Sequence, residues 1–225
     1  MSVIPKKGDA ELWRAAREQL ARGEQATIRI EVPTTTGEAF TFDHILHPTP
    51  TLLVAGAGHI AAALASMAPS IDFDTTVIDD RADHASAARF PSARCIVGDI
   101  ESELRRFPIT PNTYIVIVTR GHRHDAAALG AVIQSPAKYV GLIGSKRKVL
   151  TILRGLRDAG VPVDLLRRVH APIGLNLGAI TPGEIAVSIA AELVAVRRGV
   201  ATDAVRSMRF PLPLGEGEPS NSVNP

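Results

Sequence analysis

The chain contains a single cysteine, Cys95, among its 225 residues. One cysteine forms no disulfide within the chain, and such cysteine usage is typical of proteins from a reducing compartment. No run of about 18 apolar residues occurs, so no segment has the length that a transmembrane helix needs. The first residues also lack an apolar stretch of signal-peptide length. We therefore expect a cytoplasmic protein without a membrane-spanning segment.

A marked excess of one charge is also missing. Lys and Arg number 25, against 23 Asp and Glu, and the basic residues are scattered along the chain. Proteins that bind nucleic acid or an anionic membrane surface usually carry a larger and more clustered basic excess. The balance therefore argues against both partners. The composition, 45% apolar and 21% charged, is that of a soluble protein with one sizeable core.

The first part of the chain has the pattern of a small separate unit. Residues 10–22 place apolar side chains at helical spacing. Segments 25–32 and 39–46 alternate apolar and polar residues, and the Thr-Thr-Thr-Gly stretch between them favours a hairpin. Two prolines in residues 47–50 then predict a stiff, extended link. We expect an N-terminal helix and hairpin subdomain over residues 1–47.

A regular alternation of short apolar segments and helices follows the link. The apolar segments are apolar on both faces, as strands of a covered parallel sheet are, and the helices between them can serve as crossovers. The expected strands are 51–55, 75–78, 94–97, 113–118 and 139–143, the crossover helices are 60–67, 85–90, 102–107 and 125–134, and two further helices span 146–159 and 182–199. The pattern predicts an α/β fold, a Rossmann-like doubly wound parallel sheet, over residues 48–199. Residues 200–225 are rich in Pro, Gly and Ser and are expected to be disordered.

The first of these strands leads into a G-x-G-x-x-A pattern formed by Gly56, Gly58 and Ala61, directly before a helix. Gly56 permits a tight turn, Gly58 lets the backbone approach a phosphate, and small Ala61 lets the helix close onto the strand. Backbone amides near Ala57, together with the positive end of the helix, then attract an anion. The pattern predicts a phosphate-bearing ligand at this loop.

Two acids, Asp79 and Asp80, follow the second expected strand, about 20 residues after the glycine pattern, where an acid often binds a ribose hydroxyl. Arg81 comes directly after them, which makes NAD a weaker prediction than a phosphate-bearing ligand in general. The acids are nevertheless candidate ligand-binding residues.

A second anion site is a further hypothesis at Ser145, Lys146 and Arg147, where a helix begins after the fifth strand. Cations at the start of a helix oppose the helix dipole, so their placement is locally unfavourable unless an anion is bound. The alternative is a solvated basic face, which is the usual meaning of a run of charges.

Three histidines are expected near the carboxyl edge of the sheet. His59 follows the first strand and His122 follows the fourth, and these two strands flank the switch point of a doubly wound sheet. His170 begins a glycine-rich loop, which includes Gly174 and can fold over the same edge. Because no H-x-x-x-H spacing occurs, we predict hydrogen-bonding roles and no metal site. Cys95 is interpreted as a small apolar residue of the third strand and not as a reactive thiolate.

Several longer segments carry a resemblance to a known family. They are LLVAGAGHIA (52–61), VIDDR (77–81) with RFP (89–91), VIVTRGHRHD (116–125), YVGLIGSKRK (139–148) and HAPIGLNLGAITPGEIAVSIAAELVAVRRG (170–199). The last two are long and unusual, and all stand in the family order. From about Pro48 to Gly199 the chain resembles the carboxy-terminal Rossmann domain of the XdhC/CoxI family, the accessory factors of xanthine dehydrogenase.

The resemblance implies a protein that binds molybdenum cofactor (molybdopterin), shields it, cooperates with a cysteine desulfurase and delivers it to a xanthine dehydrogenase-like molybdenum hydroxylase. Full-length members resemble one another in a larger first domain with a glycine-rich, cysteine-containing segment, which residues 1–47 do not contain. A homodimer is the expected assembly. The residues carried over as cofactor-binding are Gly56, Gly58, His59, Asp79, Asp80, His122, Ser145, Lys146, Arg147, His170 and Gly174.

Two other functions stay open on the residues alone, an NAD(P)-binding oxidoreductase and a nucleotide-sensing regulatory domain. An oxidoreductase needs catalytic groups beside the nicotinamide, yet no Tyr-x-x-x-Lys occurs and no substrate domain follows the sheet. A cofactor chaperone needs only a binding crevice. The sequence therefore favours a non-enzymatic accessory factor, with NAD(P) or another nucleotide as the alternative ligand.

Overall fold

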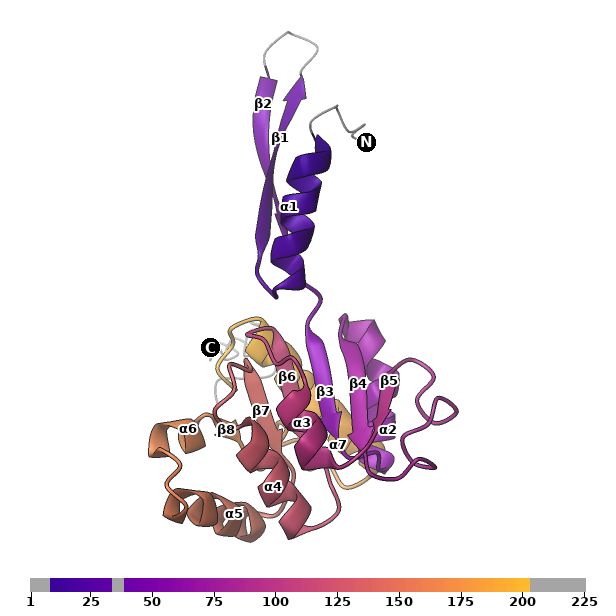
Figure 1. The fold of residues 1–225 in the computed structure, drawn as a ribbon, viewed down its shortest axis with the longest axis vertical. Helices are drawn as coiled ribbons and strands as arrows, with labels where there is room; N and C mark the ends of the chain where they lie inside the picture. Colours follow the sequence, from indigo (N-terminus) through magenta and orange to yellow (C-terminus); the bar gives the residue numbers. More distant parts are fainter. Residues whose placement is uncertain (1–8, 34–38, 203–225) are drawn as a thin grey trace, which may run out of the picture.

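The computed structural model describes residues 9–33 and 39–202. The turn expected between residues 33 and 39, and most of the tail expected to be disordered, lie outside the described residues. The described chain forms a narrow N-terminal arm and a broader α/β body (Figure 1). No helix in the described ranges is long and apolar enough to cross a membrane.

The arm is one helix packed on a two-stranded antiparallel sheet. It consists of α1 (Asp9–Ala21), β1 (Ala26–Pro33) and β2 (Ala39–Leu46). Ala16 of α1 packs against Ala26 and Ile28 of β1, and these three side chains are buried. The predicted helix and hairpin are thus confirmed, and the arm has a small apolar core of its own.

The body is built on a six-stranded sheet in which every pair of neighbouring strands is parallel. Its spatial order is β5-β4-β3-β6-β7-β8, so the first strand of the body lies in the middle and the order reverses beside it. This is the Rossmann strand order, and it puts the switch point between β3 and β6. The strands are β3 (Thr51–Ala55), β4 (Asp74–Asp79), β5 (Arg94–Val97), β6 (Thr113–Ile117), β7 (Tyr139–Leu142) and β8 (Val169–His170).

Helices cover both faces of the sheet, as the prediction of strands apolar on both faces requires. One face is covered by α2 (His59–Met67), the short 3-10 helix η1 (Ala68–Ile71) and α7 (Pro182–Arg197). The other face is covered by α3 (Ile100–Arg106), α4 (His122–Val132), α5 (Lys146–Asp158) and α6 (Val163–Arg167). The predicted doubly wound α/β fold is confirmed.

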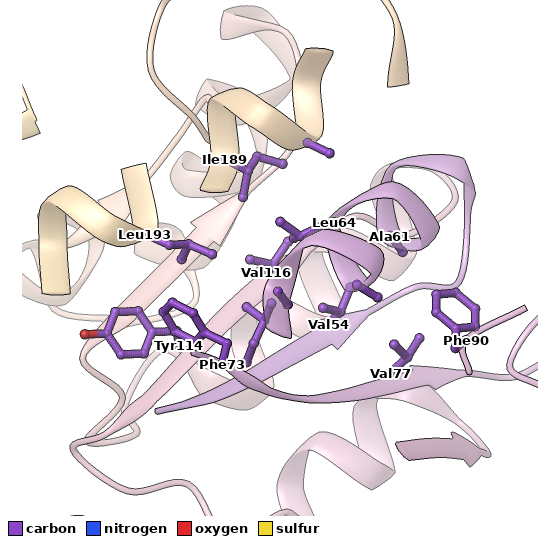
Figure 2. Packing of buried hydrophobic residues seen from close by; sticks show 14 of the residues in the cluster. Val54, Ala61, Leu64, Phe73, Val77, Phe90, Tyr114, Val116, Ile189 and Leu193 are labelled. Carbon is purple, nitrogen blue, oxygen red and sulfur yellow. The ribbon is translucent and has the colours of Figure 1, made fainter. Parts of the chain in front are cut away.

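The core under α2 and α7 shows why the glycine pattern ends in a small residue. Ala61 and Leu64 of α2 lie over Val54 of β3, and Ile189 and Leu193 of α7 pack beside them (Figure 2). Ala61 is completely buried, so a larger side chain there would push α2 away from the sheet.

Some details differ from the sequence prediction. Residues 85–90 form successive turns and no helix, with the Phe90 amide bonded to the Ser86 carbonyl. The segment is held by Phe90, which is buried in the core, and is followed by Pro91, which provides no backbone donor. The structure also adds α6 and the two-residue strand β8, which are too short to show a periodic pattern.

The arm joins the body at the end of the sheet opposite the glycine pattern. The link after the hairpin enters β3 at its amino end, where the Asn112 side-chain amide donates to the carbonyls of Pro48 and Thr49. The G-x-G-x-x-A loop leaves β3 at its carboxyl end. The arm and the carboxyl edge therefore lie at opposite ends of the molecule (Figure 1).

Candidate anion-binding site

The loop between β3 and α2 begins with a glycine that no other residue can replace without strain. Gly56 has φ of 105°, in the left-handed region, and a Cβ atom there would lie 2.6 Å from the Val118 carbonyl oxygen. The Gly56 amide donates to the Ile78 carbonyl of β4 at 2.8 Å. The start of the loop is therefore fixed against β4 on one side and against the segment that follows β6 on the other.

The carboxylate of Asp79 holds the next residue of the loop. Its Oδ2 accepts a hydrogen bond from the Ala57 amide at 2.7 Å, and both of its oxygens accept from the Arg81 guanidinium at 2.8 and 2.9 Å. Asp79 is only 2% exposed. Burial raises its pKa, but the hydrogen bonds from Arg81 and Ala57 outweigh this and hold the pKa well below its ordinary range.

These contacts correct two expectations about individual residues. The Ala57 amide is bound to an internal carboxylate, so it is not one of the donors that face a ligand. Both oxygens of Asp79 are occupied as well, and Asp79 therefore organises the loop and does not offer an acceptor to a ribose hydroxyl. Asp80, the neighbouring acid, is exposed at the same edge.

The donors available to an anion begin at Gly58, the N-cap residue of α2. Gly58 has an ordinary φ of −78°, no side chain caps the helix there, and a Cβ atom at this position would meet nothing within 4 Å. The amides of the first turn have no partner within a helix, and the helix dipole makes this end positive. His59, the first residue of α2, is exposed beside them. An open space thus adjoins a positive helix end.

Arg89 adds a cation beside the loop. Its guanidinium donates to the carbonyls of Ala57 and His84, at 2.9 and 3.1 Å. Within the described residues, it makes no ion pair with a carboxylate. Sequence analysis identifies Arg89 only as part of the RFP motif (89–91) and does not predict this contact. A single arginine before Phe-Pro does not indicate which distant loop its side chain will contact.

Charged groups of both signs surround the loop. Asp79, Asp80 and Asp83 provide carboxylates, and Arg81, Arg89 and Arg120 provide guanidinium groups. Arg120 follows β6 and donates to both oxygens of Asp80 at 3.1 Å. Arg89, which has no carboxylate partner among the described residues, together with the helix end makes this edge suited to an anion.

The second predicted anion site is organised differently from the expectation. The next cation along the chain, Lys148, forms an ion pair with Asp125 of α4, which is completely buried and also accepts from the Thr119 hydroxyl at 2.6 Å. The Ser145 hydroxyl accepts from the Lys148 amide and thus caps α5. A cation at this helix start therefore has its counter-ion within the protein.

Lys146 and Arg147 remain exposed at the start of α5. They follow β7, which β6 separates from β3. Because neighbouring strands lie about 4.8 Å apart, these two residues belong to a position about 10 Å along the edge from the loop after β3. They stand apart from the loop itself, and their role in binding stays a prediction.

The sheet order separates His170 from the other two predicted histidines. His59 begins α2 and His122 begins α4, after the adjacent strands β3 and β6, but the side chain of His122 lies outside the described part. His170 ends β8, three strands away from β3. Within the described ranges, no three His, Cys, Asp or Glu side chains lie close enough to hold a metal ion.

His170 and Gly174 instead contact a buried acid of α7, Glu192, which sequence reasoning missed. The Glu192 carboxylate lies 3.2 Å from Nδ1 of His170, and it accepts from the Gly174 amide at 2.8 Å and from the Tyr139 hydroxyl. Burial raises the pKa of Glu192, but the hydrogen bonds from His170, Tyr139 and Gly174 lower it below its ordinary value. The signal was a lone acid in the apolar run IAAELVAV.

Cys95 lies half-buried in β5, at the edge of the sheet. Burial raises the pKa of its thiol above the ordinary value. A thiol with a raised pKa carries little thiolate at neutral pH, so it is a poor nucleophile. The position agrees with the interpretation of Cys95 as a packed apolar side chain.

A parallel sheet in the Rossmann order, with a glycine loop and an open helix start at its switch point, defines a Rossmann-type domain. A family model described as the XdhC Rossmann domain matches residues 52–193. The chain belongs to the XdhC family, as its sequence motifs predict.

Relatives in other organisms extend this comparison. The chain is 35% identical over 150 residues to the uncharacterized protein YqeB of Escherichia coli strain K12, covering 66% of this chain and 27% of YqeB. It is 31% identical over 157 residues to a probable xanthine dehydrogenase subunit of Bacillus subtilis strain 168, covering 69% of this chain and 46% of that protein. The chain thus spans less than half the length of these two relatives.

A solved structure described as a xanthine dehydrogenase from Bacillus halodurans has a similar fold. It superposes with a TM-score of 0.71 at 24% identity, over 84% of this chain and 67% of that chain. At this level of identity the likeness extends to the fold.

Replacing Gly56 with alanine should destabilise the protein, whereas the same change at Gly58 should not. Gly56→Ala puts a methyl group 2.6 Å from a carbonyl oxygen in left-handed backbone, so we expect a loss of about 1–3 kcal/mol in the free energy of unfolding. Gly58→Ala adds its methyl group to open space. Urea unfolding of both variants measures the difference, and equal losses would contradict the loop geometry.

The Glu192 network should make stability depend on pH in the acid range. Because the pKa of Glu192 is lower in the folded chain than its ordinary value of 4.5, its contribution is fully present above that pH and is lost as the pH falls below it. The free energy of unfolding should therefore fall more steeply from pH 5 to pH 3 in the wild type than in Glu192→Gln. Parallel slopes would contradict this, and Glu24→Gln is the control for removing one carboxylate.

Proposed function

We propose that this chain is an accessory factor that binds molybdenum cofactor and supports the maturation of a xanthine dehydrogenase-type molybdenum hydroxylase. Membership of the XdhC family supports the proposal. The Bacillus subtilis relative, a probable xanthine dehydrogenase subunit, supports the class of partner. Because the chain spans less than half of each curated relative, the activity of the whole protein is part of the proposal.

The observation that carries the proposal is the open, positive helix start at Gly58. Molybdopterin ends in a phosphate monoester, and the first turn of a helix next to a glycine loop is suited to such a dianion. Arg89 and Arg120 supply further positive charge at the same edge. The protein's part is to hold and shield the cofactor as cargo, which requires these donors and no catalytic base.

The same site is less suited to NAD(P), the alternative ligand. In a dinucleotide site, the acid after the second strand offers its oxygens to a ribose hydroxyl. Here the corresponding acid, Asp79, is buried and bound to Arg81 and Ala57. This arrangement supports a phosphate monoester over an adenine dinucleotide.

Sulfuration of the bound cofactor would be the work of a cysteine desulfurase in this proposal. The raised pKa of Cys95 makes this residue unsuited to carry sulfur as a thiolate. The proposed cycle therefore has the chain hold the cofactor, a desulfurase modify it and the hydroxylase receive it. The homodimer expected from the sequence belongs to the same proposal.

Protein purified from cells that make molybdenum cofactor should retain both pterin and molybdenum, and Gly58→Val should lose most of both. The valine side chain fills the space beside the helix start while φ of −78° tolerates it. Gly155→Val is the matched control, because a Cβ at Gly155 also meets nothing within 4 Å, but on α5. Pterin is measured by fluorescence after oxidation, and molybdenum by mass spectrometry.

Two outcomes would contradict the proposal. If the wild type retains neither pterin nor molybdenum but binds NADH saturably, the nucleotide-binding alternative is correct. If Gly58→Val retains as much cofactor as Gly155→Val, the cofactor does not lie at this loop.

A further inference from the structure

One ion pair connects the two strands that flank the glycine loop. Asp80 follows β4 and Arg120 follows β6, and the Arg120 guanidinium donates to both carboxylate oxygens at 3.1 Å. β3, the strand from which the loop emerges, lies between β4 and β6. The pair therefore bridges the switch point.

Both partners are adjacent to residues that contact the loop directly. Asp79, beside Asp80, accepts the Ala57 amide at 2.7 Å. The backbone of Thr119, beside Arg120, lies within 3.0 Å of where a Cβ on Gly56 would be. The bridge is thus formed by residues next in sequence to those that hold Gly56 and Ala57 of the loop.

The bridge is also weak and accessible. The side chains of Arg120 and Asp80 are 56% and 41% exposed. An exposed ion pair contributes about 0–1 kcal/mol, because water solvates both charges. Asp80 is additionally near the Arg81 guanidinium, at 3.7 Å, so it keeps a cationic neighbour when Arg120 leaves. An anion near the loop therefore competes easily for Arg120.

We propose that Arg120 is a specificity-determining residue. It pairs with Asp80 in the protein without ligand and moves to a second anionic group of the ligand when the ligand binds. The inference rests on the proposed function and deepens it. The ligand class is a phosphate monoester that carries another anionic group, as the oxo and sulfur ligands of molybdenum cofactor provide. Arg120 binds this second group, while the backbone amides at the start of α2 bind the phosphate.

Two variants should then act in opposite directions. Arg120→Gln removes a charged hydrogen-bond donor and should weaken binding of molybdenum cofactor about tenfold or more. Asp80→Asn releases Arg120 and should strengthen binding about two- to fivefold. Inorganic phosphate carries only the first anionic group, so its affinity should fall much less than that of the cofactor in Arg120→Gln.

The chain offers a matched control pair on α3. Arg105 and Glu101 form an exposed ion pair at 2.8 Å, with side chains 57% and 42% exposed. Arg105→Gln and Glu101→Gln repeat the same charge changes on α3, which follows the edge strand β5, two strands from β3, and should leave both affinities unchanged. Binding is measured by ultrafiltration with cofactor released from a purified molybdenum hydroxylase, and by calorimetry with inorganic phosphate. Thermal unfolding of each variant confirms its fold.

The outcomes separate this inference from the proposed function. Opposite shifts for Arg120→Gln and Asp80→Asn support it. Equal losses in both variants would mean that the ion pair only supports the loop, and unchanged cofactor affinity in Arg120→Gln would mean that Arg120 contacts no ligand; either result overturns the inference but leaves the proposed function. A wild type that binds neither cofactor nor phosphate overturns both.

Discussion

The hydrogen bond from the Ala57 amide to the buried Asp79 carboxylate is the contact on which the rest of the carboxyl edge depends. It ties the loop after β3 to the end of β4, and the Arg81 guanidinium completes the set by neutralising the same carboxylate. A buried carboxylate without such partners would be costly, so Asp79 depends on the hydrogen bonds from Ala57 and Arg81. With Ala57 fixed, the next residue, Gly58, starts α2 facing open space.

The same contact divides the residues at this edge into those that support the loop and those that are left to contact a ligand. Asp79 and Gly56 make contacts within the protein that shape the loop. In the proposed function the ligand is bound by Gly58, the first turn of α2 and the nearby cations. Elsewhere in the body, the acids Asp125 and Glu192 likewise pair with internal partners, Lys148 and His170. Several polar residues that look like ligand contacts in sequence are thus structural, because a buried charge needs a partner wherever the fold encloses it.

Much of the fold could be predicted from local patterns. The strands of the body, the glycine loop and the capping box of Thr181 and Glu184 at the start of α7 involve residues close in sequence, whose spacing reflects their geometry. Partners far apart in sequence could not be predicted. The contacts of Arg120 with Asp80 and of Glu192 with His170 join residues 40 and 22 positions apart, and only the strand order brings them together.

The segment at 85–90 shows a second limit, because its apolar residues have helical spacing but are held in turns by the burial of Phe90 and by the bonds of Arg89 to two carbonyls. For His59, the sequence predicted the position at the helix start, and its role in binding stays a prediction. For His170, the sequence predicted a contact at the same edge, whereas the sheet places it three strands away.

The central claim, that an anionic cofactor lies against the start of α2, is tested most directly by following backbone amide resonances of isotope-labelled protein during titration with molybdenum cofactor. The account predicts that the largest shifts occur at Gly58 and His59 and in the segment around Arg120. Shifts confined to the start of α5 near Lys146, or an unchanged spectrum at saturating cofactor, would contradict it.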